Sequence, residues 1–223
     1  GSGPFPVVTY LPGINCLMEV KYNYDAGYAP LDVVPRSGRV LVRPVLEGQF
    51  ERSDPGVFPR YASPNTHQSM EMVWALEYRR VLDYLESRDD LTLENLNYSG
   101  LSLGAAYAGI ICSIEDRVRS IILISGGLTP TRSLSALSGG TGYFDRVTQP
   151  TLMLNGRYDY IFPYEENQVF LANLIGTPAE DLKAVVYDAG HLPPPRNQMI
   201  KEIADWLDTY QPLSETVEPN AAP

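Results

Sequence analysis

Short apolar runs alternate along the chain with longer stretches in which apolar residues recur every three or four positions. The short runs are rich in β-branched residues and end at turn-forming residues, as the run at residues 6–11 ends at Pro12-Gly13. Residues 120–125 (Ser-Ile-Ile-Leu-Ile-Ser) are apolar almost without interruption, which is typical of a strand covered on both faces. The pattern predicts strands at residues 6–11, 40–45, 96–99, 120–125, 151–155 and 184–188.

The longer stretches have the period of amphipathic helices. From residue 68 onward, Met70, Val73, Trp74 and Val81 fall at helical spacing with charged residues between them. Further helices are expected at residues 103–114, 164–175 and 197–210. Residues 48–65 and 126–149 are rich in glycine, serine, proline or threonine, and we expect them to form loops.

Strands that alternate with helices predict an α/β fold, in which a mostly parallel sheet carries helices on both faces. We expect one domain over residues 1–210. Residues 211–223 are polar and contain three prolines, so they are expected to form a flexible tail. In open parallel sheets of this kind, the working site lies at the carboxyl ends of the strands.

Ser102 is the candidate nucleophile. It stands in Gly100-Leu101-Ser102-Leu103-Gly104, between a predicted strand and a predicted helix. A Gly-x-Ser-x-Gly motif in that context forms a tight turn, in which side chains at the glycine positions would collide. The alternative is an ordinary serine in a glycine-rich turn. The turn would also leave the backbone N–H of Leu103 at a helix N-terminus, where it can bind an oxyanion.

His191 is the candidate general base. The chain has two histidines, and in sites with this elbow the order along the chain is nucleophile, acid, base. His67 precedes the serine, in what we expect to be an extended loop, and is more simply a histidine without a catalytic role. His191 follows the last predicted strand, where a loop can carry it above Ser102.

Asp159 is the candidate acid, because it lies in a turn after the strand at residues 151–155. It would accept a hydrogen bond from His191 and fix the tautomer of the ring. Asp188 is the alternative, since it is only three residues from the histidine, but its place at a strand end favours another orientation. A second oxyanion donor is expected in the turn after the first strand, from the N–H of Ile14 or Asn15; the alternative is a plain turn.

The charge and composition of the chain argue against several classes of partner and cofactor. The formal net charge is −10 and no lysine–arginine cluster is present, so nucleic acid is an unfavourable partner. No segment has the apolar length of a membrane helix and no signal peptide is evident, so we expect a cytoplasmic protein. Cys16 and Cys112 cannot form a disulfide framework, and with two histidines they make a poor metal site. We expect no metal and no cofactor.

These motifs resemble the α/β-hydrolase superfamily. The elbow, the acid loop Gly156-Arg157-Tyr158-Asp159 ending at Pro163, and the pair Gly190-His191 are similar to its dienelactone hydrolase and prolyl-oligopeptidase-like branch. Residues 155–163 and 187–197 also resemble hydrolase domains at the C-terminal end of some bacterial serine/threonine kinase polypeptides, and residues 36–40 and 47–52 fit that group. The similarity spans about residues 7–210.

The chain departs from the family in two places. Members usually have one or two strands before the strand at residues 6–11, and here the sequence leaves no room for them. The sheet would then have an open edge, which a second copy of the chain or an N-terminal segment could cover. The tyrosine-rich residues 15–36 are the second departure, an expected insertion near the pocket.

The resemblance implies hydrolysis of a carboxylic ester through an acyl-enzyme. Because the connection at residues 126–149 is too short for a large lid, we expect small esters, with short acyl chains or small aromatic groups. The candidate pocket walls are aromatic: Phe58, Tyr61, Tyr143, Phe144, Tyr158 and Tyr160. The alternatives are a serine peptidase of the prolyl-oligopeptidase-like type, whose usual gating domain we do not find, and a non-catalytic interaction domain with this fold.

Overall fold

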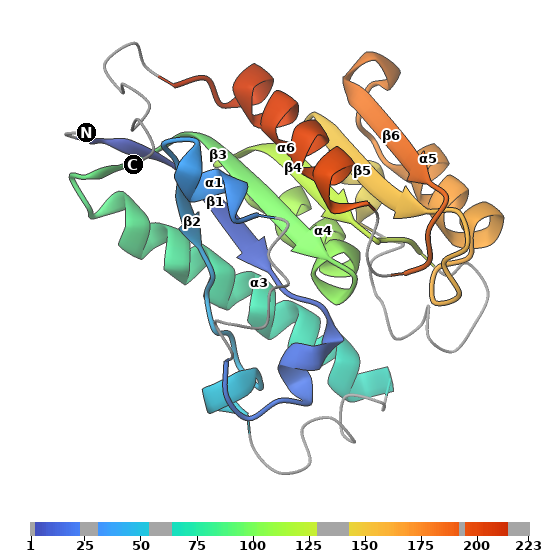
Figure 1. The fold of residues 1–223 in the computed structure, drawn as a ribbon. Coiled ribbons are helices and arrows are strands. Elements are labelled where there is room, and N and C mark those ends of the chain that lie inside the picture. Colours follow the sequence, from blue (N-terminus) through green and yellow to red (C-terminus); the bar gives the residue numbers. More distant parts are fainter. Residues whose placement is uncertain (1–2, 23–30, 54–63, 129–142, 192–194, 214–223) are drawn as a thin grey trace.

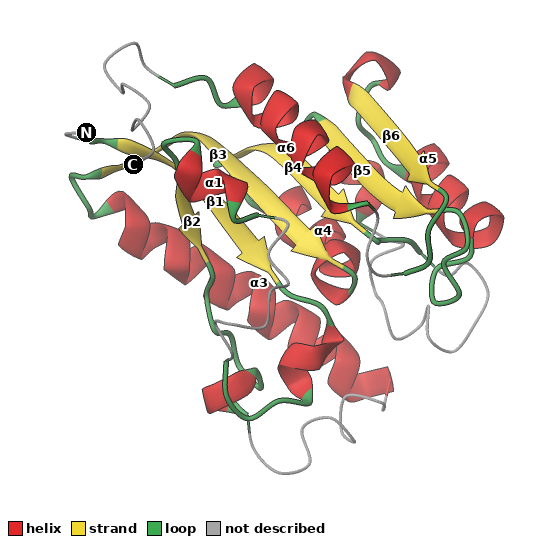
Figure 2. Ribbon diagram, viewed as in Figure 1, coloured by secondary structure: helices red, strands yellow, loops and turns green. Residues whose placement is uncertain are grey.

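Six parallel strands form one sheet at the centre of the protein (Figures 1 and 2). The computed structural model describes residues 3–22, 31–53, 64–128, 143–191 and 195–213, without the side chains of residues 64–68. The strand order is β2-β1-β3-β4-β5-β6, and every neighbouring pair is parallel. The strands are β1 (Phe5–Leu11), β2 (Val40–Val42), β3 (Leu91–Leu101), β4 (Val118–Ile124), β5 (Thr151–Gly156) and β6 (Leu182–Tyr187). The predicted α/β class is therefore confirmed.

Helices cover both faces of the sheet. They are α1 (Val33–Arg36), α3 (Pro64–Glu86), α4 (Leu103–Ile114), α5 (Phe170–Leu174) and α6 (Arg196–Tyr210). Successive residues of β4 point to opposite faces, as the pleat requires. Ile121 and Leu123 join the core under α3, α4 and α5, whereas Ile122 and Ile124 join the core under α1 and α6. Both cores are thus built on one continuous apolar strand, which explains why its sequence shows no alternation.

Several element boundaries differ from the predictions. Helix α3 begins at Pro64 rather than residue 68, so His67 lies on a helix and not in an extended loop. Strand β3 begins at Leu91 rather than residue 96, and the predicted helix at 164–175 is a π-helix (η5, Tyr164–Val169) followed by α5. The sequence pattern did not predict α1 or four short helical turns, which lie in segments expected to be loops or left unassigned. These turns are η1 (Ile14–Leu17), η2 (Phe50–Arg52), η4 (Phe144–Arg146) and η6 (Ala179–Asp181).

The residue after the last helix is part of the core. Between the pairs Pro6↔Thr92 and Val8↔Asn97 the register of β1 and β3 shifts, which leaves a bulge in β3. The amide Nε2 of Gln211 donates to the carbonyl of Val7 at 2.8 Å and to that of Asn95 at 2.7 Å, and Gln211 is fully buried. Gln211 therefore belongs to the core and not to the predicted tail, because it is buried and its amide binds both β1 and β3. Residues 214–223 lie outside the described chain.

Strand β2 forms one edge of the sheet and β6 the other among the described residues. The three residues of β2 pair with β1 at Val7, Val8 and Thr9. Coverage of the β2 edge by a second copy or another segment stays a prediction. No helix in the described ranges has the length and apolarity needed to cross a membrane.

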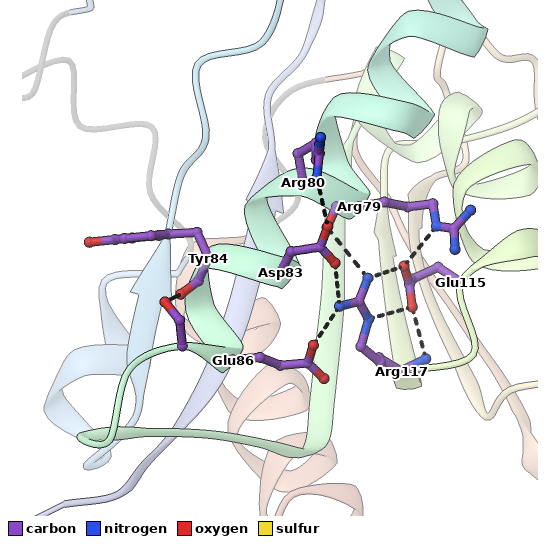
Figure 3. Close-up of polar contacts among 8 residues, drawn as sticks. Arg79, Arg80, Asp83, Tyr84, Glu86, Glu115 and Arg117 are labelled. Carbon is purple, nitrogen blue, oxygen red and sulfur yellow. Dashed lines mark hydrogen bonds and ion pairs between the residues drawn. The ribbon is translucent and has the colours of Figure 1, made fainter.

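A network of charged groups joins α3 to the turn between α4 and β4 (Figure 3). Arg117 makes two hydrogen bonds of 2.7 Å to the carboxylate of Glu115, and it also donates to Asp83 at 3.0 Å and Glu86 at 2.8 Å. The Glu115 side chain is only 4% exposed. Burial by itself would raise the pKa of Glu115, but the hydrogen bonds and charge of Arg117 outweigh it and hold that pKa below its usual value.

Replacing Arg117 by Ala should lower the free energy of unfolding by about 2–3 kcal/mol at pH 7, because among the described residues it leaves the buried carboxylate with Arg79, at 3.5 Å, as its one cationic partner, beside the backbone N–H of residue 117. The carboxylate is stabilised in its charged form, so this contribution is present above the unfolded-state pKa of glutamate, about 4.3, and is lost as the pH falls through the lower folded-state value. Urea unfolding at pH 7 and at about pH 3 measures both effects.

Arg80→Ala is the matched control, since Arg80 is exposed and pairs with Asp83 at 3.6 Å. We expect a change below about 0.5 kcal/mol for an exposed pair. Equal losses for the two variants, or a loss in Arg117→Ala that persists undiminished in acid, would contradict this account of Glu115.

Candidate active site

The elbow around Ser102 is backbone-strained and tightly packed. Ser102 has φ 50° and ψ −104°, a conformation that costs a non-glycine residue about 1–3 kcal/mol. A Cβ on Gly100 would lie 2.5 Å from the carbonyl of Gly104, and a Cβ on Gly104 would lie 2.3 Å from the carbonyl oxygen of Leu11. Both glycines of the motif are therefore required by close backbone approach, as the sequence predicts.

Two hydrogen bonds hold the elbow in place. The N–H of Ser102 donates to the carbonyl of Ile124 on the neighbouring strand at 2.8 Å. The hydroxyl of Tyr98, fully buried on β3, donates to the carbonyl of Gly104 at 2.6 Å. Sequence reasoning missed Tyr98, because a tyrosine inside an apolar strand gives no sign of what its hydroxyl contacts.

The three residues predicted to act together meet at the carboxyl ends of β3, β5 and β6. His191 Nε2 lies 2.9 Å from Ser102 Oγ, and His191 Nδ1 lies 2.8 Å from Asp159 Oδ2. Exposed fractions are 7% for Ser102, 3% for Asp159 and 7% for His191, so the set is largely shielded from water. A histidine between a hydroxyl and a carboxylate can remove the hydroxyl proton while the carboxylate fixes its tautomer.

The loop after β5 fixes the carboxylate of Asp159. Its Oδ1 accepts hydrogen bonds from the backbone N–H groups of Ile161 at 2.8 Å and Phe162 at 2.9 Å, which leaves Oδ2 for the histidine. Asp188, the alternative acid, is exposed and pairs with Arg157 at 3.3 Å. Among the two carboxylates weighed from the sequence, only Asp159 contacts the ring.

The π-helix η5 supports this loop from behind. Gln168 is buried, and its amide donates to the carbonyls of Gly156 and Phe162, both at 2.8 Å. Asn167 donates to the carbonyl of Leu128 at 2.7 Å and accepts the N–H of Leu128 through its own carbonyl. The two ends of the acid loop and the segment after β4 are thus bound to one helical turn. In the sequence, the two adjacent amide side chains are the one sign of this arrangement.

The turn after β1 lies against the serine. A Cβ on Gly13 would lie 3.4 Å from Cβ of Ser102, and the N–H of Gly104 donates to the carbonyl of Pro12 at 3.1 Å. Ile14 and Asn15 begin the 3-10 helix η1, and Leu103 begins α4. All three candidate donors therefore stand at helix starts. N–H groups in the first turn of a helix have no partner within that helix, so they can bind an oxyanion.

Comparison with known proteins gives a consistent picture of the fold. No protein-family model matches the chain, and no curated protein matches its sequence. Among solved structures, TT1662 from Thermus thermophilus has a TM-score of 0.73 at 21% identity over 95% of this chain and 91% of its own. A cold-adapted esterase from an Arctic intertidal metagenomic library has 0.70 at 18%, over 94% and 84%. A putative dienelactone hydrolase from Klebsiella pneumoniae has 0.66 at 15%, over 94% and 88%.

The chain has the α/β-hydrolase fold. In this fold the elbow joins β3 to α4, and the acid and the histidine follow β5 and β6. The order of the three residues along the chain thus matches the order of the strands that carry them.

The residues predicted to line the pocket lie in different surroundings. Tyr160 is exposed and its ring centroid lies 6.5 Å from that of His191, whereas the exposed Tyr158 has no ring contact with the histidine. Tyr143 is half-buried against the core. Phe144 is wrong as a pocket wall, because it is fully buried in the space that Gly109 leaves on α4. Phe58 and Tyr61 lie outside the described residues.

Phe162 is the aromatic residue that the prediction missed. Its ring centroid lies 5.9 Å from that of His191, and its Cβ lies 2.8 Å from where a Cβ of Gly127 would be. The acid loop contains it, but only the direction of its side chain sets it apart from the neighbouring tyrosines.

The described side chains include no group of three or more His, Cys, Asp or Glu residues that could hold a metal ion. Cys16 and Cys112 are free, buried thiols, and burial raises the pKa of each. Cys16 follows the turn at Gly13, but its burial disfavours the thiolate, the form in which a cysteine acts as a nucleophile.

Proposed function

We propose that this α/β-hydrolase fold is a serine hydrolase that cleaves carboxylic esters through an acyl-enzyme. The observation that carries the proposal is the continuous pair of hydrogen bonds from Ser102 through His191 to Asp159, 2.9 and 2.8 Å long. The strained backbone of Ser102 adds support, because such strain persists only where the surrounding structure enforces it. A complete set of this kind has no structural task that would explain it in a non-catalytic domain.

In the proposed reaction His191 Nε2 removes the proton from Ser102 Oγ while Oγ attacks the ester carbonyl. The negative charge that develops on the carbonyl oxygen is stabilised by the N–H of Leu103 and by that of Ile14 or Asn15. His191 then gives its proton to the departing alcohol, and the acyl group stays on Ser102. A water molecule, deprotonated by His191, releases the acid in the second half of the cycle. The reaction uses only protein groups and water.

We further propose small esters, with short acyl chains or a small aromatic group, as substrates. Tyr160 and Phe162 supply aromatic surface beside the histidine. The similar structures named above include an esterase and a putative dienelactone hydrolase, which agrees with an ester substrate. The resemblance to the dienelactone hydrolase and prolyl-oligopeptidase-like branch also leaves amide bonds as an alternative substrate class.

Labelling with a fluorophosphonate probe tests the proposal, together with a p-nitrophenyl ester series from acetate to octanoate. We expect labelling at Ser102, located by peptide mass spectrometry, and the highest kcat/KM among the shortest chains. Preference for octanoate would overturn the small-ester proposal, and faster cleavage of a matched anilide would favour a peptidase. Absence of both labelling and turnover would contradict the hydrolase proposal and favour a non-catalytic binding domain.

A further inference from the structure

A second feature of the same end of the sheet is a pocket beside the turn that follows β1. It lies at the carboxyl ends of β1 and β2, and its walls include Tyr10, Pro12, Tyr22, Arg43, Val45 and Phe50. The rings of Tyr22 and Phe50 meet edge to face at 5.0 Å between centroids. The pocket is therefore mainly aromatic and apolar, with one cationic group.

Arg43 is held in this pocket by tyrosines. Its Nη1 donates to the hydroxyl of Tyr22, and its guanidinium carbon lies 5.4 Å from the ring centroid of Tyr10 and 5.9 Å from that of Tyr22. Contacts of a guanidinium with aromatic faces orient its plane without neutralising its charge. The Nε and Nη2 edge, which carries two parallel N–H groups, makes no hydrogen bond to the described residues.

No carboxylate of the described chain forms an ion pair with Arg43. Glu51 is next to the pocket residue Phe50, but its carboxylate accepts the backbone N–H of Tyr22 at 3.0 Å. An arginine without a carboxylate partner is unusual in a chain with 27 acidic and 17 basic residues. Three other described arginines, Arg36, Arg119 and Arg146, also have no carboxylate partner, but all three are exposed to solvent, whereas Arg43 is half-buried.

The pocket and the serine share one turn. Pro12 lines the pocket, and its carbonyl accepts the N–H of Gly104 in the elbow. Gly13, the next residue, lies against Ser102. A substrate whose ester group reaches the serine can therefore extend along this turn toward Arg43.

We propose that Arg43 binds a carboxylate group carried by the ester substrate. The inference rests on the proposed function and narrows it to anionic esters. The planar N–H pair of a guanidinium matches the two oxygens of a carboxylate, and a charge-assisted pair of this kind is stronger than a neutral hydrogen bond. The partly buried aromatic walls reduce competition from water and strengthen the interaction.

The test compares anionic and neutral esters in the wild type and in Arg43→Gln. Mono-p-nitrophenyl succinate against p-nitrophenyl pentanoate places the carboxylate on the acyl side, and 4-acetoxybenzoate against p-tolyl acetate places it on the alcohol side. We expect the wild type to prefer the anionic member of at least one pair. In Arg43→Gln the ratio of the two kcat/KM values should fall about 10- to 100-fold.

Arg119→Gln is the matched control, because it removes the same charge from an exposed arginine at the other end of the sheet, on β4. Its ratio should equal that of the wild type. If Arg43→Gln and Arg119→Gln change the ratio equally, or if neither changes it while neutral esters turn over, the inference is overturned. Melting temperatures of both variants show whether a fall in the ratio comes from unfolding.

Direct binding separates this inference from the proposed function. Titration with 4-methylbenzoate, followed by NMR, should show binding to the wild type that is weakened at least 10-fold in Arg43→Gln and retained in Arg119→Gln. Binding of 4-methylbenzoate without ester turnover would support the carboxylate site at Arg43 and contradict the proposed hydrolase activity. Ester turnover without carboxylate binding, and without a preference for anionic esters, would support the hydrolase activity and contradict the carboxylate site.

Discussion

Replacing Ser102 by Ala should lower kcat for p-nitrophenyl acetate by about 10⁴- to 10⁶-fold, the range found when the nucleophile of a serine hydrolase is removed. The variant loses the Oγ that lies 2.9 Å from His191 Nε2, so no acyl-enzyme can form. Folding should be retained, because the Ser102 N–H still bonds to Ile124 and alanine is smaller than serine. Fluorophosphonate labelling should disappear in parallel, and intact-mass spectrometry measures that loss.

Ser125→Ala is a close control for this experiment. Ser125 follows β4, the strand next to β3, and like Ser102 it has a positive φ, 49° against 50°. It is also buried, but its hydroxyl has no hydrogen-bond partner in the part of the chain that the structure describes. Activity within about fivefold of the wild type is expected, since a surplus hydroxyl without a base is not activated. Comparable losses in both variants would show that the assay reports on elbow integrity rather than on a nucleophile.

Asp159→Asn should lower kcat by about 10⁴-fold, the loss seen when the corresponding acid of a serine protease is replaced in this way. The amide oxygen can still accept the N–H groups of Ile161 and Phe162, so the loop is preserved. The amide nitrogen that replaces Oδ2 cannot accept a hydrogen bond from the N–H at His191 Nδ1. The ring then takes the tautomer with the proton on Nε2, which cannot act as a base toward Ser102.

The matched variant Asp188→Asn separates the two acids weighed from the sequence. Asp188 pairs with Arg157 in an exposed position, so its replacement should change kcat less than about twofold and stability by less than about 0.5 kcal/mol. Steady-state kinetics with one short-chain ester measure both variants. If Asp188→Asn were the more damaging, the acid assignment would be reversed.

The strand-and-helix order and the meeting of Ser102, His191 and Asp159 were predictable because each depends on local pattern or on chain order. Helix α4 has the bounds that its sequence indicates, Leu103–Ile114, because the elbow glycines mark its start. The start of β3 was not predictable, since the polar residues Glu94 and Asn95 fall in a bulge that breaks the strand pattern. Aromatic composition likewise did not distinguish Phe144, which fills the space beside Gly109, from Phe162, which lies near the histidine.

Buried polar contacts between distant segments were the least accessible to sequence reasoning. Gln168 holds both ends of the acid loop, and Tyr98 holds the elbow, yet each is an unremarkable residue in its own segment. Such contacts depend on which atoms the finished sheet brings together. Local propensity and period describe one element at a time and carry no information about them.

The amide of Gln211 also constrains when the sheet can be finished during synthesis. Gln211 binds the carbonyl of Val7, 204 positions earlier, and β1 is an interior strand of the sheet. A ribosome releases the N-terminal strand first, so Val7 emerges long before its partner has been translated. Contacts across so many residues are also slow to form. The contact of Gln211 with the carbonyls of Val7 and Asn95 can therefore form only after all six strands have been synthesised.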